Sequence, residues 1–545
     1  MLRIAHGRVY DPQHGVGGEI RDVWIQEGKV VAPPAMVDAP TIDASGCAVM
    51  PGGVEIHSHV AGAKVNTGRS ICPEDHTDHF RLHTDVTRAG CGYTIPTTFM
   101  TGYEYVRLGY TTLFEAAVPP LTARHAHEEL RDIPIVDTGC YTVMGNNYLV
   151  LKVLSDPDEA RRRERMRELV AWLLQATRGY AVKIVNPGGV ENWKWNQDVT
   201  DLDTAVPPFG VTPRQIVSGL AQAVEELGLP HSIHLHANHL GEPGNVDTTL
   251  ATMHALAGHR VHFTHLQFHS YDITQRGGYA SAASRIAECV NAHPEFTCDV
   301  GQLVFGPATT MTSDAPMEFR LHHLQKQKWV NVDVEMETGS GIVPMVYRPH
   351  TLVNAVQWCV GLELMLLIRD PWRVFLTTDH PNAGPFVAYP LLIRLLMDLD
   401  FRRSWLDRLH PQARQYTCLH ELTREYTLEE IVIVTRAGPA RALGLPRKGQ
   451  LGVGADADVA VFRLQQDWQS TFSNPACVVK GGKVVWRDGE VVDSGAGRAL
   501  GIDLAAGRQL APDLAECFER YSTVKLENYA VEDEYVPDLE LVACR

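Results

Sequence analysis

Residues 48–59 read Ala-Val-Met-Pro-Gly-Gly-Val-Glu-Ile-His-Ser-His, an apolar run that ends in two histidines separated by one serine. Side chains alternate along a β-strand, so His57 and His59 point to the same side of it. Two imidazoles at a strand end make a pair of metal ligands, and packing alone rarely needs both of them. A strand that ends in ligands predicts a barrel whose strands all deliver side chains to one face.

Four more candidate ligands follow in later apolar runs, and they are Lys183, His236, His265 and Asp379. Lys183 is the least expected of them, because an ammonium group inside Ala-Val-Lys-Ile-Val is costly to bury. Its amine could instead extend to the strand end and solvent. The functional interpretation is a carbamylated lysine whose carboxylate bridges two metal ions, and the ordered set of partners favours it.

Two of the predicted strands carry more histidines than the ligand roles require. The competing residues are His231, His234, His236 and His239 in one region and His262, His265 and His269 in the next. Nearness to the strand end favours His236 and His265, although spacing leaves both choices open. The remaining histidines are interpreted as hydrogen-bonding neighbours, substrate contacts or core residues.

Imidazole and carboxylate ligands suit Zn²⁺ or a similar divalent ion. Two such ions are expected, and a bound metal lowers the pKa of water to about 7. Asp379 is the predicted catalytic residue, which both binds metal and moves the proton between water and the leaving amine. This chemistry predicts hydrolysis of an amide-type bond.

The middle of the chain alternates strands and helices, which predicts the α/β class and a (β/α)8 barrel over residues 51–429. Beyond the strand that ends at His57, the expected strands are 92–98, 133–138, 180–185, 232–237, 260–266, 296–300 and 374–377. The expected helices include 161–177 and 213–227. Residues from about 306 to 370 exceed what one helix needs, so they are expected to contain an insertion.

Both ends of the chain have short alternating segments with tight turns. This pattern predicts a small β-sandwich domain built jointly from residues 1–50 and 430–500. Residues 501–545, with a helix expected at 513–521, are predicted to form a C-terminal tail outside both domains that contacts another subunit.

The composition of the 545 residues is that of an ordinary globular protein, with 45% hydrophobic and 21% charged residues. A net charge of −16 argues against nucleic acid as a partner. The sequence has no apolar run of 18 residues and no signal-like N-terminus, so no membrane association is expected. Eleven scattered cysteines without a C-x-x-C pair indicate a reduced cytoplasmic protein.

These motifs resemble those of the amidohydrolase superfamily. Residues 49–59 are similar to its first-strand signature, residues 378–381 to its last-strand motif and residues 451–458 to the motif of its β-domain. The resemblance extends over nearly the whole chain.

Residues 55–62, 233–245 and 264–269 look like the A subunit of formylmethanofuran dehydrogenase and its bacterial counterpart, the hydrolase subunit of the formyltransferase/hydrolase complex. The resemblance implies two metal ions on His57, His59, carbamylated Lys183, His236, His265 and Asp379. It also implies hydrolysis of an N-formyl furan carrier to formate and the free amine, within a complex that includes a formyltransferase. The arginine-rich composition favours the bacterial version, which releases formate. In the methanogen version the site works with formate from a tungsten or molybdenum subunit.

The tail of such a carrier is expected to be rich in glutamate, so cations near the barrel mouth become candidates for binding it. These candidates are Lys64, Arg69 and Arg348, for which ordinary surface charge is the alternative. Two other functions remain as alternatives, a cyclic-amide hydrolase of the dihydropyrimidinase type and a non-catalytic scaffold subunit. The insertion and residues 233–245 argue against the first, and the complete ligand set argues against the second.

Overall fold

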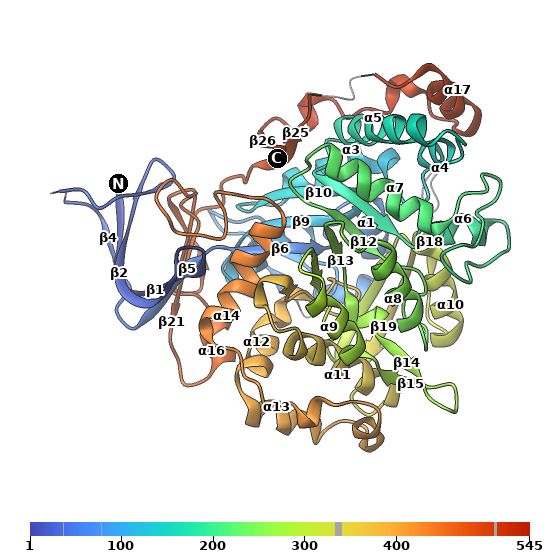
Figure 1. Ribbon diagram of the computed structural model, residues 1–545. Coiled ribbons are helices and arrows are strands. Elements are labelled where there is room, and N and C mark those ends of the chain that lie inside the picture. The colour runs from blue at the N-terminus through green and yellow to red at the C-terminus, as the bar shows by residue number, and fades with distance from the viewer. Residues whose placement is uncertain (36–37, 78, 333–339, 506–508) are drawn as a thin grey trace.

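The computed structural model describes residues 1–35, 38–77, 79–332, 340–505 and 509–545 (Figure 1). Eight parallel strands form the centre of the molecule, and each pairs with the next along the chain. They are β6 (Gly53–Ser58), β9 (Tyr110–Val118), β10 (Asp137–Val143), β11 (Ala181–Val185), β12 (Ile233–His236), β13 (Val261–Phe263), β16 (Phe296–Asp299) and β20 (Val374–Phe375). A parallel bridge between Ser58 and His380 joins the first strand to the chain just after the last. The predicted α/β barrel is confirmed.

Helices between the strands cover the outside of the barrel (Figure 1). The predicted helices are confirmed as α5 (Glu159–Thr177) and α7 (Pro213–Glu226). Helix α7 begins with a capping box, in which Thr212 and Gln215 each accept a hydrogen bond from the other's backbone N–H. Helix α11 (Leu352–Leu367) is apolar around most of its circumference because other elements enclose it.

Two of the expected barrel strands are misplaced. Residues 92–98 contain bends instead of a strand, because Gly92 has a φ of 104° and Pro96 lacks a backbone N–H. Helix α2 (Thr98–Arg107) follows, and the second barrel strand is β9, which was not predicted from the sequence. The strand expected at 133–138 begins only at Asp137, where β10 starts.

The long segment before α11 forms a small antiparallel sheet of its own. Its strands are β17 (Gly306–Thr312), β18 (Val330–Val332) and β19 (Ser340–Tyr347), and helix α10 (Ala315–Gln325) packs on β19. Residues 333–339 of the expected insertion lie outside the described residues. The limits of the barrel domain at 51 and 429 stay predictions.

The two ends of the chain meet in one sheet of nine strands, at the left of Figure 1. Strands β1 (Leu2–Asp11), β2 (Val16–Gln26), β3 (Lys29–Val31), β4 (Thr41–Asp43) and β5 (Cys47–Pro51) come from the start of the chain, and β21 (Val459–Arg463), β22 (Cys477–Lys480), β23 (Lys483–Arg487) and β24 (Glu490–Val491) from the end. Antiparallel pairing of β5 with β21 joins the two halves. This confirms the predicted separate domain built from both ends of the chain, which has its own hydrophobic core. Hydrogen bonds join its nine strands into one continuous sheet.

The last residues differ from the expected tail outside both domains. Strand β25 (Ala499–Asp503) pairs with β10 of the barrel, and β26 (Leu539–Ala543) pairs with β25. The expected helix is α17 (Pro512–Tyr521), whose buried Leu514 and Phe518 join the main core. The apolar side chains explain the difference, because a free tail would leave them in water. Residues 506–508 lie outside the described residues.

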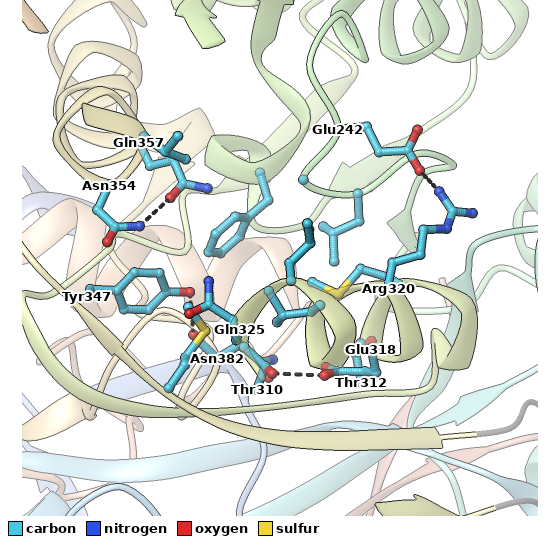
Figure 2. A pocket seen from close by; sticks show the side chains of 18 of the residues that line it. Glu242, Thr310, Thr312, Glu318, Arg320, Gln325, Tyr347, Asn354, Gln357 and Asn382 are labelled. Atoms are coloured by element: carbon cyan, nitrogen blue, oxygen red, sulfur yellow. Dashed lines mark hydrogen bonds and ion pairs between the residues drawn. The ribbon is translucent and has the colours of Figure 1, made fainter. Parts of the chain in front are cut away.

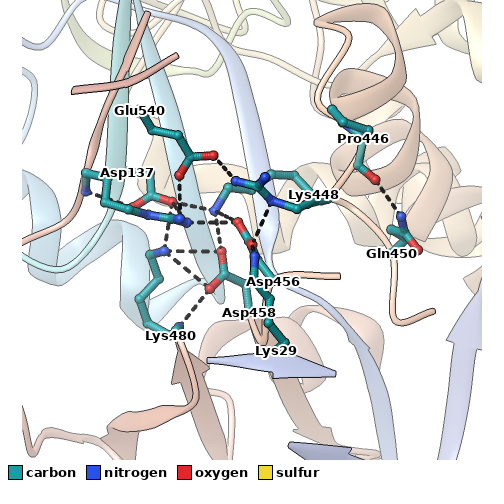
Figure 3. A network of polar contacts seen from close by, with 12 residues as sticks. Lys29, Asp137, Pro446, Lys448, Gln450, Asp456, Asp458, Lys480 and Glu540 are labelled. Carbon is teal, nitrogen blue, oxygen red and sulfur yellow. Dashed lines mark hydrogen bonds and ion pairs between the residues drawn. The ribbon is translucent and has the colours of Figure 1, made fainter. Parts of the chain in front are cut away.

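A network of buried charges connects the barrel, the β-domain and the C-terminal segment (Figure 3). Lys448 Nζ contacts Asp137 at the start of β10 and lies 2.7 Å from Asp458 Oδ2 and 3.1 Å from Asp456 Oδ2. Arg498 lies 2.9 Å from Asp137 and 2.8 Å from Asp456. The three parts are therefore joined by ion pairs that are largely removed from solvent.

Within the described ranges, the structure contains no helix that is both long and apolar enough to cross a membrane.

Candidate metal centre

The six predicted ligands converge at the carboxyl ends of the barrel strands. His57 lies in β6 and His59 follows it, Lys183 lies in β11, His236 ends β12, and His265 and Asp379 follow β13 and β20. None of the six side chains belongs to a residue more than 4% exposed. Because parallel strands of a barrel end on the same face, ligands that are distant in sequence meet there.

Three of these residues, His57, His265 and Asp379, offer ligand atoms that all lie within 4.8 Å of one another. Asp379 Oδ1 lies 2.8 Å from His57 Nε2 and 3.4 Å from His59 Nε2. Ligand atoms bonded to one ion at about 2.0–2.2 Å lie roughly 3 Å apart, so these spacings fit a shared divalent cation.

The hydrogen-bonding state of the cluster also fits a cation. In the described part of the chain, His57 Nε2 and His265 Nδ1 are buried without a hydrogen-bond partner. Buried polar atoms in proteins are almost always paired, so the unpaired His265 nitrogen and the His57 nitrogen beside the Asp379 carboxylate suit a bound cation. The donor set of imidazole and carboxylate suits zinc.

Lys183 has no hydrogen-bond partner for its Nζ among the residues that the structure describes, although it is 1% exposed. Burial lowers its pKa to about 7, because desolvation disfavours the ammonium form. A substantial fraction of the amine is therefore uncharged near neutral pH, and the uncharged amine is the form that can react with carbon dioxide.

The competing histidines differ in how their ring nitrogens are used. His234 bonds to His57 and His231, and His262 bonds to Thr297 and Asp299, so both nitrogens of each ring are occupied. Among the described residues, the hydrogen bond of His236 is made by Nε2, which lies 3.2 Å from Asp314. This pattern favours His236 over His234, and the cluster with His57 and Asp379 favours His265 in the next region.

His269 is a further buried histidine at this centre. Its ring lies 5.3 Å from that of His236 and 5.4 Å from that of His265. Neither of its nitrogens has a hydrogen-bond partner in the described residues. His269 therefore lies beside two of the proposed ligands with both of its ring nitrogens unused.

Three buried carboxylates behind the ligands were not found from the sequence. Glu115 lies 3.1 Å from His59 Nδ1, Asp314 lies 3.2 Å from His236 Nε2, and Asp299 accepts the backbone N–H of His265 at 3.0 Å. Burial opposes ionisation of Glu115, but Lys64 and His59 hold its pKa at about 2. Such carboxylates fix the orientation and tautomer of ligating histidines.

The backbone is strained at two of the predicted ligands. His265 has a φ of 37° and Asp379 a φ of 45°, in a region that residues other than glycine rarely adopt. Strain of this kind concentrates at functional sites, where the surrounding structure holds it in place. Gly301 leaves room for the turn at His265, because a Cβ atom there would lie 2.5 Å from His265 Cβ.

A cavity of about 630 Å³ adjoins the candidate metal centre, and Figure 2 shows side chains that line it. His236, His265 and Asp379 lie at its inner end, and the small sheet and α10 supply much of its wall. Most of its lining is apolar, including Leu240, Phe268, Met317, Leu321, Leu324, Met345 and Val353. Polar groups in the wall bond to one another, as Arg320 does to Glu242 and Asn354 to Gln357. A long, partly apolar ligand fits this channel.

The three cations proposed from the sequence have different positions. Lys64 is buried and donates to Ala117 O at 2.7 Å. Arg69 is largely buried and binds Glu129 at 3.0 Å. Only Arg348 is exposed in the cavity wall, so it is the one that can meet a charged ligand.

Comparisons with known proteins give matches over the whole length. The amidohydrolase family model matches residues 40–493. Protein FwdA of Methanocaldococcus jannaschii is 46% identical over 555 residues, which cover 98% of this chain and 97% of the relative. The A subunit of the formyltransferase/hydrolase complex Fhc of Methylorubrum extorquens is 40% identical over 557 residues, with 100% of both chains covered.

A solved structure has the same fold from end to end. It is the formyltransferase/hydrolase complex FhcABCD of Methylorubrum extorquens in complex with methylofuran, with a TM-score of 0.94 and 40% identity over 100% of both chains. The β-domain, the barrel and the C-terminal segment are therefore all common to this chain and that relative.

Proposed function

The chain belongs to the amidohydrolase family, and we propose that it hydrolyses the formamide bond of an N-formylated furan carrier, giving formate and the free amine. The observation that carries this proposal is a buried centre of unpaired ligand atoms at the inner end of a long, mostly apolar cavity. A formyl group is small enough to reach such a centre, while the carrier occupies the channel.

The proposed centre holds two divalent ions, with zinc as the best match to the donors. Its ligands are His57, His59, Lys183 as a carbamate, His236, His265 and Asp379. When bound, the ions would polarise the formamide carbonyl and acidify water. The unpaired Lys183 Nζ supports the carbamate, because carbamylation would replace the ammonium group that burial disfavours with a carboxylate whose charge the two ions would balance.

Asp379 is the proposed catalytic acid and base. Its Oδ1 faces His57 and His59, and its carboxylate also lines the cavity. Asn382 Nδ2 donates to the same Oδ1 at 2.9 Å and fixes the orientation of the carboxylate. From this position Asp379 can accept a proton from water and return it to the nitrogen of the leaving amine.

The carrier and the partner subunits are proposed by analogy with the relatives. The Methylorubrum relative belongs to a formyltransferase/hydrolase complex whose structure contains methylofuran. We therefore propose a complex that includes a formyltransferase, and a carrier with a glutamate-rich tail that Arg348 meets at the cavity mouth. Eleven free cysteines fit the proposed cytoplasmic location.

The arginine-rich composition does not select between the two versions of the enzyme. Identity is higher to the archaeal FwdA, at 46%, than to the bacterial Fhc relative, at 40%. Formate release is therefore proposed from the site and not from the composition.

The test is formate release from a purified N-formylated furan carrier by the complex, with and without a metal chelator. We expect release that the chelator abolishes and that Lys183→Ala lowers by about 10³-fold, since bound metal supplies several kcal/mol of stabilisation. Lys326→Ala, an exposed residue beyond α10, is the control and should keep full activity. Unchanged activity in Lys183→Ala would support a scaffold role instead, and cleavage of cyclic amides alone would support the dihydropyrimidinase type.

A further inference from the structure

Three histidine side chains form a continuous hydrogen-bonded row through the core of the barrel. His57 Nδ1 lies 2.8 Å from His234 Nε2, and His234 Nδ1 lies 3.1 Å from His231 Nε2. The row ends where His231 Nδ1 lies 2.8 Å from the carbonyl oxygen of Ala442. All three rings are fully buried. The row thus leads from the metal centre to the opposite end of the barrel, where β12 begins.

The end of the row determines where its hydrogens lie. Ala442 is the last residue of helix α15 (Gly438–Ala442), and its carbonyl can only accept a hydrogen bond. His231 must therefore carry its hydrogen on Nδ1, which leaves Nε2 as an acceptor in the neutral ring. His234 Nδ1 then donates to His231, and His234 Nε2 accepts from His57 Nδ1. Each neutral imidazole has one hydrogen, so every step fixes the next tautomer.

The consequence at the metal centre is a lone pair on His57 Nε2. This is the nitrogen that faces Asp379 and has no hydrogen-bond partner among the described residues. With its hydrogen held on Nδ1, the ring can offer Nε2 to a cation without first losing a proton. The opposite tautomer would point an N–H at the metal position.

A second contact has the same effect on His57. Thr264 Oγ1 donates to Asp299 Oδ2 at 2.7 Å, so its lone pairs remain to accept from His57 Nδ1, which it contacts. His262 Nε2 also lies 3.1 Å from Asp299 Oδ2, and its Nδ1 accepts from Thr297. The surroundings of His57 Nδ1 therefore consist of acceptors, and all of them favour the same tautomer.

We propose that His231 and His234 are positioning residues that hold His57 in the tautomer whose Nε2 binds metal, with the carbonyl of Ala442 as the fixed end of the row. This rests on the proposed metal centre. Neither residue touches the substrate, and no proton is gained or lost along the row. Because carboxylates and carbonyls more commonly hold a ligating histidine in this way, a row of imidazoles is a distinct arrangement of the same function.

The test measures the affinity of the purified full-length protein for Zn²⁺, by competition with a chelator, and the visible spectrum with Co²⁺ in its place. We expect His234→Phe to weaken zinc binding by about 10–100-fold, as other losses of a ligand's partner do. His234→Gln retains an acceptor near the position of Nε2 and should recover most of that loss. His231→Phe leaves His234 free to choose its tautomer and should have a smaller effect of the same sign.

His127→Phe is the matched control, because His127 is equally buried and bonds to the backbone oxygen of Thr177 at 2.9 Å, away from the metal centre. It should keep wild-type zinc affinity and the wild-type Co²⁺ spectrum. Wild-type affinity in His234→Phe would overturn the proposal, and so would an equal loss in His127→Phe. If the wild-type protein itself bound no divalent ion, the proposed function would fail rather than the role of the row. Should His234→Phe not fold, the zinc affinities of His234→Gln and His231→Phe are compared with that of wild type. Wild-type affinity in His231→Phe would then overturn the proposal.

Discussion

At the scale of single residues, the metal centre depends on groups whose ordinary interactions are absent. Lys183 Nζ, His57 Nε2 and His265 Nδ1 lack hydrogen-bond partners within the described residues, and His265 and Asp379 have strained backbones. Each of these features costs stability in isolation. Together they fit the proposed site, which cations and a carbamate would complete.

The pKa of Lys183 predicts how the centre assembles. Because burial lowers this pKa to about 7, the neutral amine becomes the main form above that pH. Uptake of carbon dioxide by the metal-free protein should therefore rise between about pH 6 and pH 8 and then level off. Isotope-labelled bicarbonate and carbon NMR would detect the carbamate.

Lys183→Arg is the control for this uptake, since a guanidinium stays charged and forms no carbamate under these conditions. Activity recovered on adding zinc should need bicarbonate in wild type. Recovery in carefully degassed, carbonate-free buffer would contradict the carbamate.

Gly301 is a second position where one added carbon atom would disturb the candidate metal centre. Gly301→Ala would place a Cβ atom 2.5 Å from His265 Cβ and 3.0 Å from its Cα, at a φ of 64°. We expect weakened zinc binding as well as a stability loss of at least about 1 kcal/mol from the left-handed backbone. Gly454→Ala has a φ of 93° but no atom within 4 Å of its added Cβ, so it should lose stability without losing zinc. Equal zinc affinity in both variants would mean that Gly301 serves the backbone alone.

The convergence of the six proposed ligands could be predicted because they follow apolar runs in a recognisable order. Nearness to the strand ends favoured His236 and His265, and the resemblance to a known family implied the same two residues. The carboxylates behind them could not be predicted in this way. Glu115 lies within an apolar strand and Asp314 precedes a helix in the insertion, and neither has a spacing that relates it to a histidine far away in sequence.

At the scale of elements, helix α10 connects the small sheet to the metal centre through the residue that caps it. Asp314 caps the helix, with Oδ1 accepting the backbone N–H of Met317 at 3.4 Å and the Asn186 side chain at 2.9 Å. Its other oxygen faces His236 Nε2 at 3.2 Å. One side chain thus begins a helix and orients a proposed ligand.

Two substitutions at Asp314 separate these roles. Asp314→Asn keeps an oxygen for the cap but turns an NH₂ group toward His236, so we expect stability close to wild type and zinc affinity lower by about 10–100-fold. Asp314→Ala removes both contacts and should also cost about 1 kcal/mol through the lost cap. Thermal unfolding and zinc competition measure the two effects. If both variants bound zinc as wild type does, the contact with His236 would have no functional role.

The elements themselves were predicted unevenly. Strands that contain a candidate ligand, such as β11 with Lys183 and β12 with His236, were found, and so were the amphipathic helices α5 and α7. Strand β9 was missed although its nine residues are all buried, because a strand enclosed on both faces has no alternation to detect. The expected strand at 92–98 had β-branched and aromatic residues, but its glycine and proline made a turn there instead.

At the scale of the whole molecule, the charge network holds three distant segments together. Lys448 lies among Asp137, Asp456 and Asp458, and the cations around these carboxyls hold their pKa values below the usual value despite burial. Carboxyls with lowered pKa values stabilise the fold above the pKa of the unfolded chain, about 4. That stabilisation is lost as the pH falls further, because protonation removes the charges.

Lys448→Met should therefore destabilise the protein by about 3–5 kcal/mol near neutral pH, since it leaves buried carboxylates without their shared cation. The difference from wild type should shrink as the pH falls below about 4, because carboxyls that are not held by the lysine become neutral there. Thermal unfolding across pH measures this. Adding Asp137→Asn should recover part of the loss, whereas a further loss in the double variant would contradict the assignment of Lys448 as the central cation.

The pairing of β5 with β21 also has a consequence for biosynthesis. Residues 47–51 leave the ribosome about 400 residues before their antiparallel neighbours at 459–463 are made. At about 5–20 residues per second, that interval lasts roughly 20–80 s. During this time the N-terminal strands have an open edge of unpaired backbone groups, which other chains can bind. The nascent polypeptide is therefore exposed to pairing with other chains at this edge until residues 459–463 have been made.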